Sequence, residues 1–174
     1  MTVVAAFAIG GFPLLFGDLL LTGPTSGRVV AVPAQGEVQN FFGESGWSIS
    51  GLRQKVCVLS DSFAVAWAGS WLGARVAIAE LRCRALAGPL SVEVATEYLA
   101  SEQELKRNPA AFIGLTYSDG YLHQFHFGAE ELHTPSLGLA YVSGSGANAI
   151  HEFAALLQSM DSAATGGPTI GNQA

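Results

Sequence analysis

The chain has 174 residues, the size of a single domain with a substantial hydrophobic core. Hydrophobic residues make up 49% of it and charged residues only 13%, which indicates large buried or subunit-covered surfaces. The formal net charge is −6, and Lys and Arg form no cluster, which argues against a nucleic-acid partner.

The first 22 residues are apolar, but they are not typical of a signal peptide or a membrane span. They contain no Lys or Arg, so the basic segment of a signal peptide is missing. Gly10-Gly11, Pro13 and Asp18 divide the run into pieces too short to cross a bilayer. We therefore expect two buried strands, Thr2 to Ile9 and Phe12 to Phe16, in a protein that is neither secreted nor membrane-bound.

Residues 23–51 have a different composition, rich in Gly, Pro, Ser and Gln, and predict a long excursion within one domain. A short piece from Arg28 to Val32 resembles a strand. Beyond the excursion, β-branched and aromatic runs separated by turn residues predict five more strands. These are Lys55 to Leu59, Phe63 to Ala68, Ala110 to Tyr117, Tyr121 to Phe127 and Leu137 to Ser143.

Three helices are predicted in the same region. The first runs from about Trp71 to Leu86 and ends at Gly88-Pro89, the second is capped by Ser91 and reaches Leu105, and the third runs from Ala147 to about Leu157. Residues 159–174 are small and polar and predict a disordered tail, which leaves one domain over 1–158. Strands, a helix pair, strands and a helix in this order suggest a layered α+β sandwich.

Thr2 follows the initiator Met directly. Excision of Met1 is favoured by a small second residue and would leave a free Thr. An N-terminal amine can act as the general base for the hydroxyl of its own residue. With a reference pKa of about 7.7–8.0, such an amine is partly neutral at physiological pH. Thr2 is therefore a candidate nucleophile that carries its own base.

Other short motifs follow Thr2 in a fixed order. They are Gly17-Asp18, Thr22, Lys55 within Leu52 to Leu59, Ala68-Gly69 before the first helix, and Gly144-Ser145-Gly146 before the last. As an ordered set, together with Thr2-Val3-Val4-Ala5, they resemble the proteasome family of N-terminal-nucleophile hydrolases. The resemblance extends to about residue 157 and is greatest to the bacterial proteasome-like peptidase that works with an ATP-driven unfoldase.

The resemblance implies a four-layer αββα sandwich in which Thr2 is the nucleophile of a threonine-type peptidase. It implies that Asp18 and Lys55 set the local field, that the Gly69 N–H forms the oxyanion hole and that Ser145 orients the Thr2 amine. Thr22 would pair through its backbone with a bound peptide. It further implies a homo-oligomeric ring in the cytoplasm, a peptide or unfolded-protein substrate, a possible ATP-driven unfoldase partner, and no cofactor.

Elementary electrostatics supports these roles. Lys55 is one of two lysines, the other being Lys106. A buried cation beside Thr2 would favour the alkoxide and keep the Thr2 amine neutral. A buried Lys is costly without a partner, and Asp18 is the obvious counter-charge. The alternatives are that Asp18 caps a turn and that Lys55 points to solvent from an edge strand. Arg28 or Arg53 could supply the positive charge instead, although neither can act as a base.

The chain departs from the family after residue 158. The family continues with another helix and closing strands, and Asp161 falls in the expected tail. Either the sequence is truncated or a neighbouring subunit closes a shorter sandwich. A catalytically silent proteasome-like subunit and an acylase for non-peptide amides therefore remain alternatives. Metal binding is not expected, because His123 and His126 lie three apart on a predicted strand and face opposite sides. Cys57 and Cys83 fit reduced thiols of a cytosolic protein.

Overall fold

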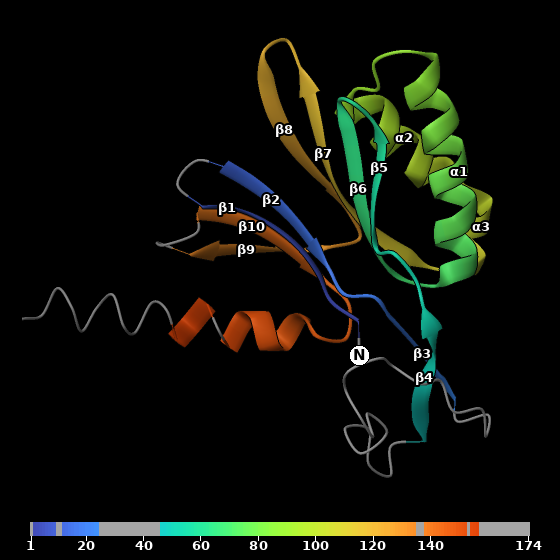
Figure 1. The fold of residues 1–174 in the computed structure, drawn as a ribbon, viewed down its shortest axis with the longest axis vertical. Coiled ribbons are helices and arrows are strands. Elements are labelled where there is room, and N and C mark those ends of the chain that lie inside the picture. Colours follow the sequence, from blue (N-terminus) through green and yellow to red (C-terminus); the bar gives the residue numbers. More distant parts are fainter. Residues whose placement is uncertain (1, 10–11, 25–45, 135–137, 153, 157–174) are drawn as a thin grey trace, which may run out of the picture.

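The fold is mixed α+β with antiparallel sheets (Figure 1). The computed structural model describes residues 2–9, 12–24, 46–134, 138–152 and 154–156. The predicted strand at 28–32, the Gly10-Gly11 turn and the tail at 159–174 lie outside the described residues. No helix within these ranges is both long and apolar enough to span a membrane.

The first sheet has the strand order β2-β1-β10-β9. Its members are β1 (Val4–Ile9), β2 (Phe12–Gly17), β9 (Glu130–Thr134) and β10 (Gly138–Ser143). β1 lies in the middle and pairs antiparallel with both β2 and β10. β2 is an edge strand on which Phe12, Leu14 and Phe16 are exposed, so the prediction of a fully buried strand there was wrong. The alternating burial of β2 is that of a half-buried edge strand.

The second sheet has the order β5-β6-β7-β8 and is built from two hairpins. Its members are β5 (Val56–Ser60), β6 (Phe63–Gly69), β7 (Ala110–Ser118) and β8 (Tyr121–Phe127). A separate pair is formed by β3 (Leu20–Pro24) and β4 (Trp47–Leu52). Strands β3, β4 and β9 were not predicted.

The helix pair after β6 differs in one respect from the prediction. α1 (Trp71–Ala87) is followed by α2 (Val92–Ser101), whose cap Ser91 accepts a hydrogen bond from the Val94 N–H at 3.3 Å. The chain does not continue as one helix to Leu105, because Glu102 adopts an extended backbone. Its carboxylate accepts from the Glu104 N–H at 2.9 Å and so caps a new short helix, α3 (Gln103–Arg107).

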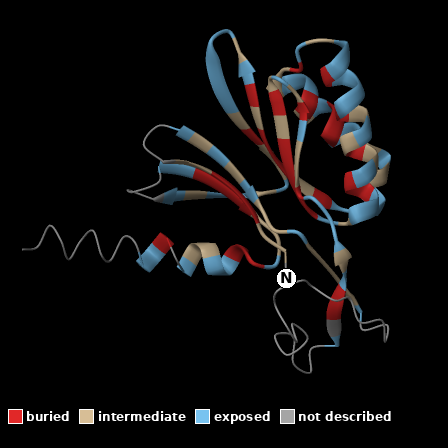
Figure 2. Cartoon of the chain, in the orientation of Figure 1, coloured by how far each residue is buried: buried red, intermediate tan, exposed pale blue. Residues whose placement is uncertain are grey.

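Three hydrophobic clusters show how these elements stack. One lies between the helices and the second sheet and includes Trp67, Leu81, Leu99 and Phe112. A second lies between the two sheets and includes Val4, Ala66, Ile113 and Tyr141. A third, with Ala5, Val142 and Ala147, joins the first sheet to the helical residues 147–152 and 154–156. Among the strands, burial is concentrated in β1, β6, β7 and β10 (Figure 2).

Candidate active site

Strand register brings the predicted site residues together at the start of β1. Val4 pairs with Gly17 on β2 and with Ser143 on β10. Because both pairings are antiparallel, the beginning of β1 lies beside the ends of its two neighbours. Thr2 and Val3 thus meet Asp18 on one side and Gly144-Ser145-Gly146 on the other. In Figure 1 the N-terminal end of β1 lies where these strands converge.

Thr2 is held through its backbone. Its N–H donates to Ser145 Oγ at 2.8 Å, and its carbonyl accepts from the Gly146 N–H at 2.8 Å. Gly144 has φ +101, and a Cβ at this position would collide with the Thr2 carbonyl. Only glycine meets both conditions without strain. The turn after β10 therefore fixes the position of the Thr2 backbone nitrogen.

Asp18 binds the backbone on both sides of its own strand end. Its carboxylate accepts from the Val3 N–H at 2.5 Å and from the Leu20 N–H at 2.8 Å. The Asp18 N–H donates in turn to the Val3 carbonyl at 3.1 Å. Asp18 therefore does cap a turn, as one alternative held, and it also ties the turn to the residue after Thr2.

Lys55 is buried, with 1% of its surface exposed, so the alternative of a solvent-facing lysine on an edge strand is wrong. Its Nζ makes no hydrogen bond to Thr2, Asp18 or any other described residue. The ammonium lies over the Trp67 ring, 4.0 Å from the ring centroid. Burial lowers the pKa of Lys55, and the nearby Asp18 carboxylate opposes that shift. The expected counter-charge thus acts across space and not through a direct contact.

The absence of a side chain at Gly17 allows Lys55 to be buried. A Cβ at Gly17 would lie 2.9 Å from Lys55 Cβ and 3.1 Å from a methyl of Val56. The missing side chain lets the segment before β5 pack against the end of β2. Thr2-Val3, Gly17-Asp18 and Lys55 are therefore neighbours.

Gly69 lies at the end of β6 with φ +101, and a Cβ there would lie 2.8 Å from the Pro109 carbonyl oxygen. Gly69 and Gly144 both line an open hollow of about 450 Å³. Apolar side chains form much of the remaining wall, among them Ala68, Leu105, Pro109 and Phe127. An apolar group can therefore be accommodated beside the residues that contact Thr2.

Thr22 lies apart from this cluster, on β3. It pairs with Ile49 of β4, next to a register shift at Leu21/Thr22. Arg28 and Arg53 were the alternative sources of positive charge near Thr2. Arg28 lies outside the described residues, whereas the Arg53 guanidinium donates to its neighbour's carbonyl, Leu52 O, at 2.8 Å and lies 5.5 Å from the Trp71 ring centroid. Arg53 therefore does not occupy the place beside Asp18.

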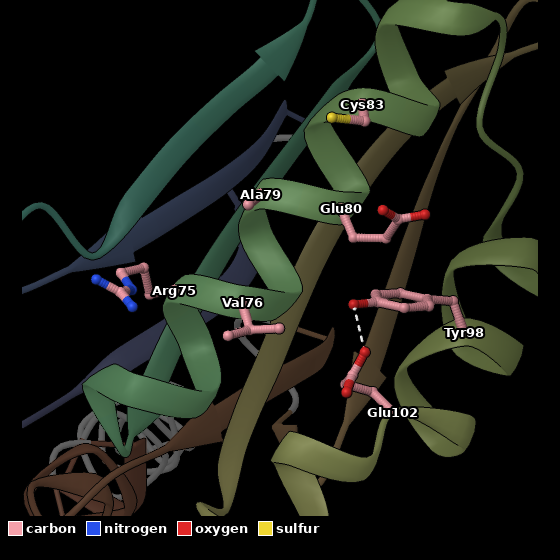
Figure 3. A pocket seen from close by; sticks show the side chains of 7 residues that line it. All are labelled: Arg75, Val76, Ala79, Glu80, Cys83, Tyr98 and Glu102. Atoms are coloured by element: carbon pink, nitrogen blue, oxygen red, sulfur yellow. Dashed lines mark hydrogen bonds between the residues drawn. The ribbon is translucent and has the colours of Figure 1, made fainter.

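A second hollow, of about 560 Å³, lies between α1 and α2, on the outer side of the helix pair (Figure 3). Its lining residues are Arg75, Val76, Ala79, Glu80, Cys83, Tyr98 and Glu102. The Tyr98 hydroxyl donates to Glu102 at 2.9 Å, and burial together with this carboxylate raises the pKa of Tyr98. A phenol kept protonated in this way is a poor base, so the hollow offers no evident acid–base pair.

Trp67 is the neighbour of Lys55 that the sequence analysis missed. It precedes Gly69 by two residues on β6, where it looked like one more apolar strand residue. No short motif links it to Lys55, which lies 12 positions earlier on the adjacent segment. Within the described ranges, no three His, Cys, Asp or Glu side chains gather as a metal site would require.

Compared with known proteins, the sequence matches no protein-family model and no curated protein.

Proposed function

We propose that this chain is a threonine-type N-terminal-nucleophile peptidase with the proteasome-like αββα sandwich, activated by removal of Met1. The observation that carries the proposal is the 2.8 Å hydrogen bond between the Thr2 nitrogen and Ser145 Oγ. That bond fixes the orientation of the future amine, while Asp18 holds the next residue and Lys55 supplies a buried cation nearby. The nucleophilic hydroxyl, the basic amine and the charged groups that influence them would then all lie at the start of β1.

In the proposed mechanism, Thr2 Oγ attacks the substrate carbonyl carbon while the Thr2 amine takes the hydroxyl proton. The C–O bond forms, and the Gly69 N–H stabilises the oxyanion. In other acyl-transfer enzymes the loss of one oxyanion donor costs about 2.7–4 kcal/mol. The C–N bond then breaks, and the leaving amine takes the proton from the Thr2 ammonium. Water hydrolyses the resulting Thr2 ester by the same base.

The charge of Lys55 favours this sequence in two ways. A cation stabilises the developing alkoxide, and it lowers the pKa of the neighbouring Thr2 amine by like-charge repulsion. A neutral amine is what a general base requires at physiological pH. Because the Asp18 carboxylate opposes the lowering of the Lys55 pKa by burial, it would help to keep Lys55 charged.

A catalytically silent proteasome-like subunit is the second candidate. It is favoured by the absence of a hydrogen bond from Lys55 Nζ to any described residue, Thr2 included. Intact-mass spectrometry after exposure to an epoxyketone or β-lactone probe separates the two. The peptidase loses Met1 and gains one probe mass, whereas Thr2→Ala loses Met1 and gains none. Thr96→Ala, on α2 and away from the proposed site, is the matched control and should label as wild type. A wild-type chain that keeps Met1 or takes up no probe would favour the silent subunit.

We further propose a homo-oligomeric ring in the cytoplasm that degrades peptides or unfolded proteins, with an ATP-driven unfoldase as a possible partner. The exposed apolar strip Phe12, Leu14 and Phe16 on edge strand β2 is consistent with contact to a second copy. Light scattering at micromolar concentration tests the assembly, and the mass of a single chain would contradict it.

A further inference from the structure

The Lys55 ammonium is a buried charge without a polar contact. It has three donor hydrogens, and none of them meets an acceptor among the described residues. The Asp18 carboxylate is near enough to influence it, but its oxygens accept backbone N–H groups of Val3 and Leu20. A charge buried in this way either has another source of stabilisation or loses its proton.

The face of Trp67 is in position to supply it. The ammonium lies 4.0 Å from the ring centroid, well inside the roughly 6 Å over which a cation and a ring attract. Tryptophan is the most effective of the aromatic side chains in this interaction. The contact is also dry, since Trp67 is 0% exposed and Lys55 1% exposed.

The ring and the lysine are locked to the same stretch of backbone. Trp67 Nε1 donates to the Gln54 carbonyl at 3.1 Å, and the Trp67 backbone N–H donates to the Lys55 carbonyl at 3.1 Å. The ring is therefore fixed relative to the lysine by bonds at both ends. On the other side, Gly17 packs against Lys55 Cβ.

Trp67 also lies against a second indole ring, tilted relative to its own. Trp71 lies 5.4 Å from it, ring centroid to ring centroid, at an interplanar angle of 39°. The Arg53 guanidinium lies over the far ring, 5.5 Å from the Trp71 centroid. Two cations thus enclose two indoles, with the buried cation at the end near Asp18 and Thr2.

We propose that Trp67 is a positioning residue that holds the Lys55 ammonium by a cation–π contact and keeps it charged beside Asp18 and Thr2. Among the described residues, the charged group that acts on Lys55 is the Asp18 carboxylate, and removal of Met1 would add the Thr2 amine; Arg53 lies beyond Trp71. The catalytic consequence rests on the proposed threonine chemistry. The effect of the ring on the Lys55 charge does not.

The test is an NMR titration of protein labelled with ¹³Cε-lysine, which gives only two side-chain signals because the chain has only Lys55 and Lys106. Exposed Lys106 is the internal control. Losing a desolvated cation–π contact of about 2 kcal/mol corresponds to a pKa decrease of about 1.5 units. Trp67→Leu should lower the Lys55 pKa by about that much, Trp67→Phe by less, and neither should move Lys106.

Because Trp67→Leu enlarges a buried space and can prevent folding, a second form of the experiment leaves the shape intact. Biosynthetic replacement of tryptophan by mono- and difluorotryptophan withdraws electron density from the indole ring but keeps the ring in place. The Lys55 pKa should fall in steps with the number of fluorines. A Lys55 pKa that is unchanged by fluorination, or that rises in Trp67→Leu, overturns the proposal.

The outcome can be separated from that of the proposed function. The titration needs no activity and can be carried out in Thr2→Ala. If the ring controls the Lys55 pKa but wild type takes up no epoxyketone, the threonine chemistry fails and the role of Trp67 stands. If wild type takes up the probe but the Lys55 pKa does not change with the ring, the threonine chemistry stands and the proposed role of Trp67 fails. When both hold, the pH profile of labelling should shift in Trp67→Phe together with the Lys55 pKa.

Discussion

Replacing Lys55 by methionine should stabilise the fold while removing activity. Lys55 is buried and its ammonium makes no hydrogen bond within the described part of the chain. Burying one ion carries an effective penalty of several kcal/mol, and a desolvated aromatic face returns about 2 kcal/mol of it. Methionine fills a similar volume and makes its own favourable contact with an aromatic ring. We expect Lys55→Met to raise the free energy of unfolding at pH 7 by about 1–3 kcal/mol.

The pH dependence gives this prediction its sign. Burial places the pKa of Lys55 in the folded protein below its ordinary value of 10.5. Between the folded and unfolded pKa values, the unfolded chain binds a proton that the folded chain does not, so stability rises with pH. The free energy of unfolding of wild type should therefore rise relative to that of Lys55→Met as pH rises through the folded-state pKa of Lys55. This rise should end near pH 10.5, the ordinary pKa of lysine.

Urea unfolding of both proteins from pH 7 to 10.5, followed by circular dichroism, measures this difference. Lys106→Met is the matched control, since Lys106 is exposed and should leave the unfolding free energy unchanged. A Lys55→Met protein that is less stable than wild type at pH 7, or a stability difference that does not narrow with pH, would refute the reasoning.

Three further changes follow from the contacts of Thr2 and Asp18. Asp18→Asn leaves one acceptor oxygen for the Val3 and Leu20 N–H groups, so the unfolding free energy should fall by about 1–3 kcal/mol, and the NMR-measured pKa of Lys55 should fall further without the carboxylate; an unchanged pKa would contradict this. Gly144→Ala adds a Cβ against the Thr2 carbonyl at φ +101 and should cost about 2 kcal/mol or more in urea unfolding, whereas Gly88→Ala, with no atom within 4 Å, should be nearly neutral. Ser145→Ala removes the acceptor for the Thr2 nitrogen and should slow epoxyketone labelling by about tenfold, the equivalent of one hydrogen bond of about 1.4 kcal/mol; labelling at the wild-type rate would count against its orienting role.

The elements with long apolar runs or clear end signals could be predicted from the sequence, and the weakly apolar ones could not. β6 and β7 were found because they are long apolar runs, and α1 because Gly88-Pro89 marks its end. β9 was missed because Leu132 is its one side chain in a hydrophobic cluster, between charged and polar neighbours. The break at Glu102 was missed because its cause is a local side-chain bond, in a stretch where helix propensity favours continuation.

The candidate site divides in the same way. The contact between Thr2 and Ser145 could be expected from the resemblance, and the burial of Lys55 from the need for a cation. What surrounds Lys55 could not, because strand register decides it and register is not legible in a single sequence. In place of the expected direct pair with Asp18, the Lys55 ammonium contacts the Trp67 ring, while the Asp18 carboxylate accepts from two backbone N–H groups.

In this arrangement the Asp18 carboxylate binds the backbone, and the Trp67 ring contacts the Lys55 ammonium. Asp18 stabilises the fold by joining β1 to the β2–β3 turn, where its carboxylate accepts from the Val3 and Leu20 N–H groups. A ring can attract a cation without competing for those N–H groups. The buried charge can then remain next to the strand end that bears Thr2 while the backbone there stays fixed. A site built in this way tolerates loss of its cation more easily than loss of its carboxylate, so Lys55→Met and Asp18→Asn should have opposite effects on stability.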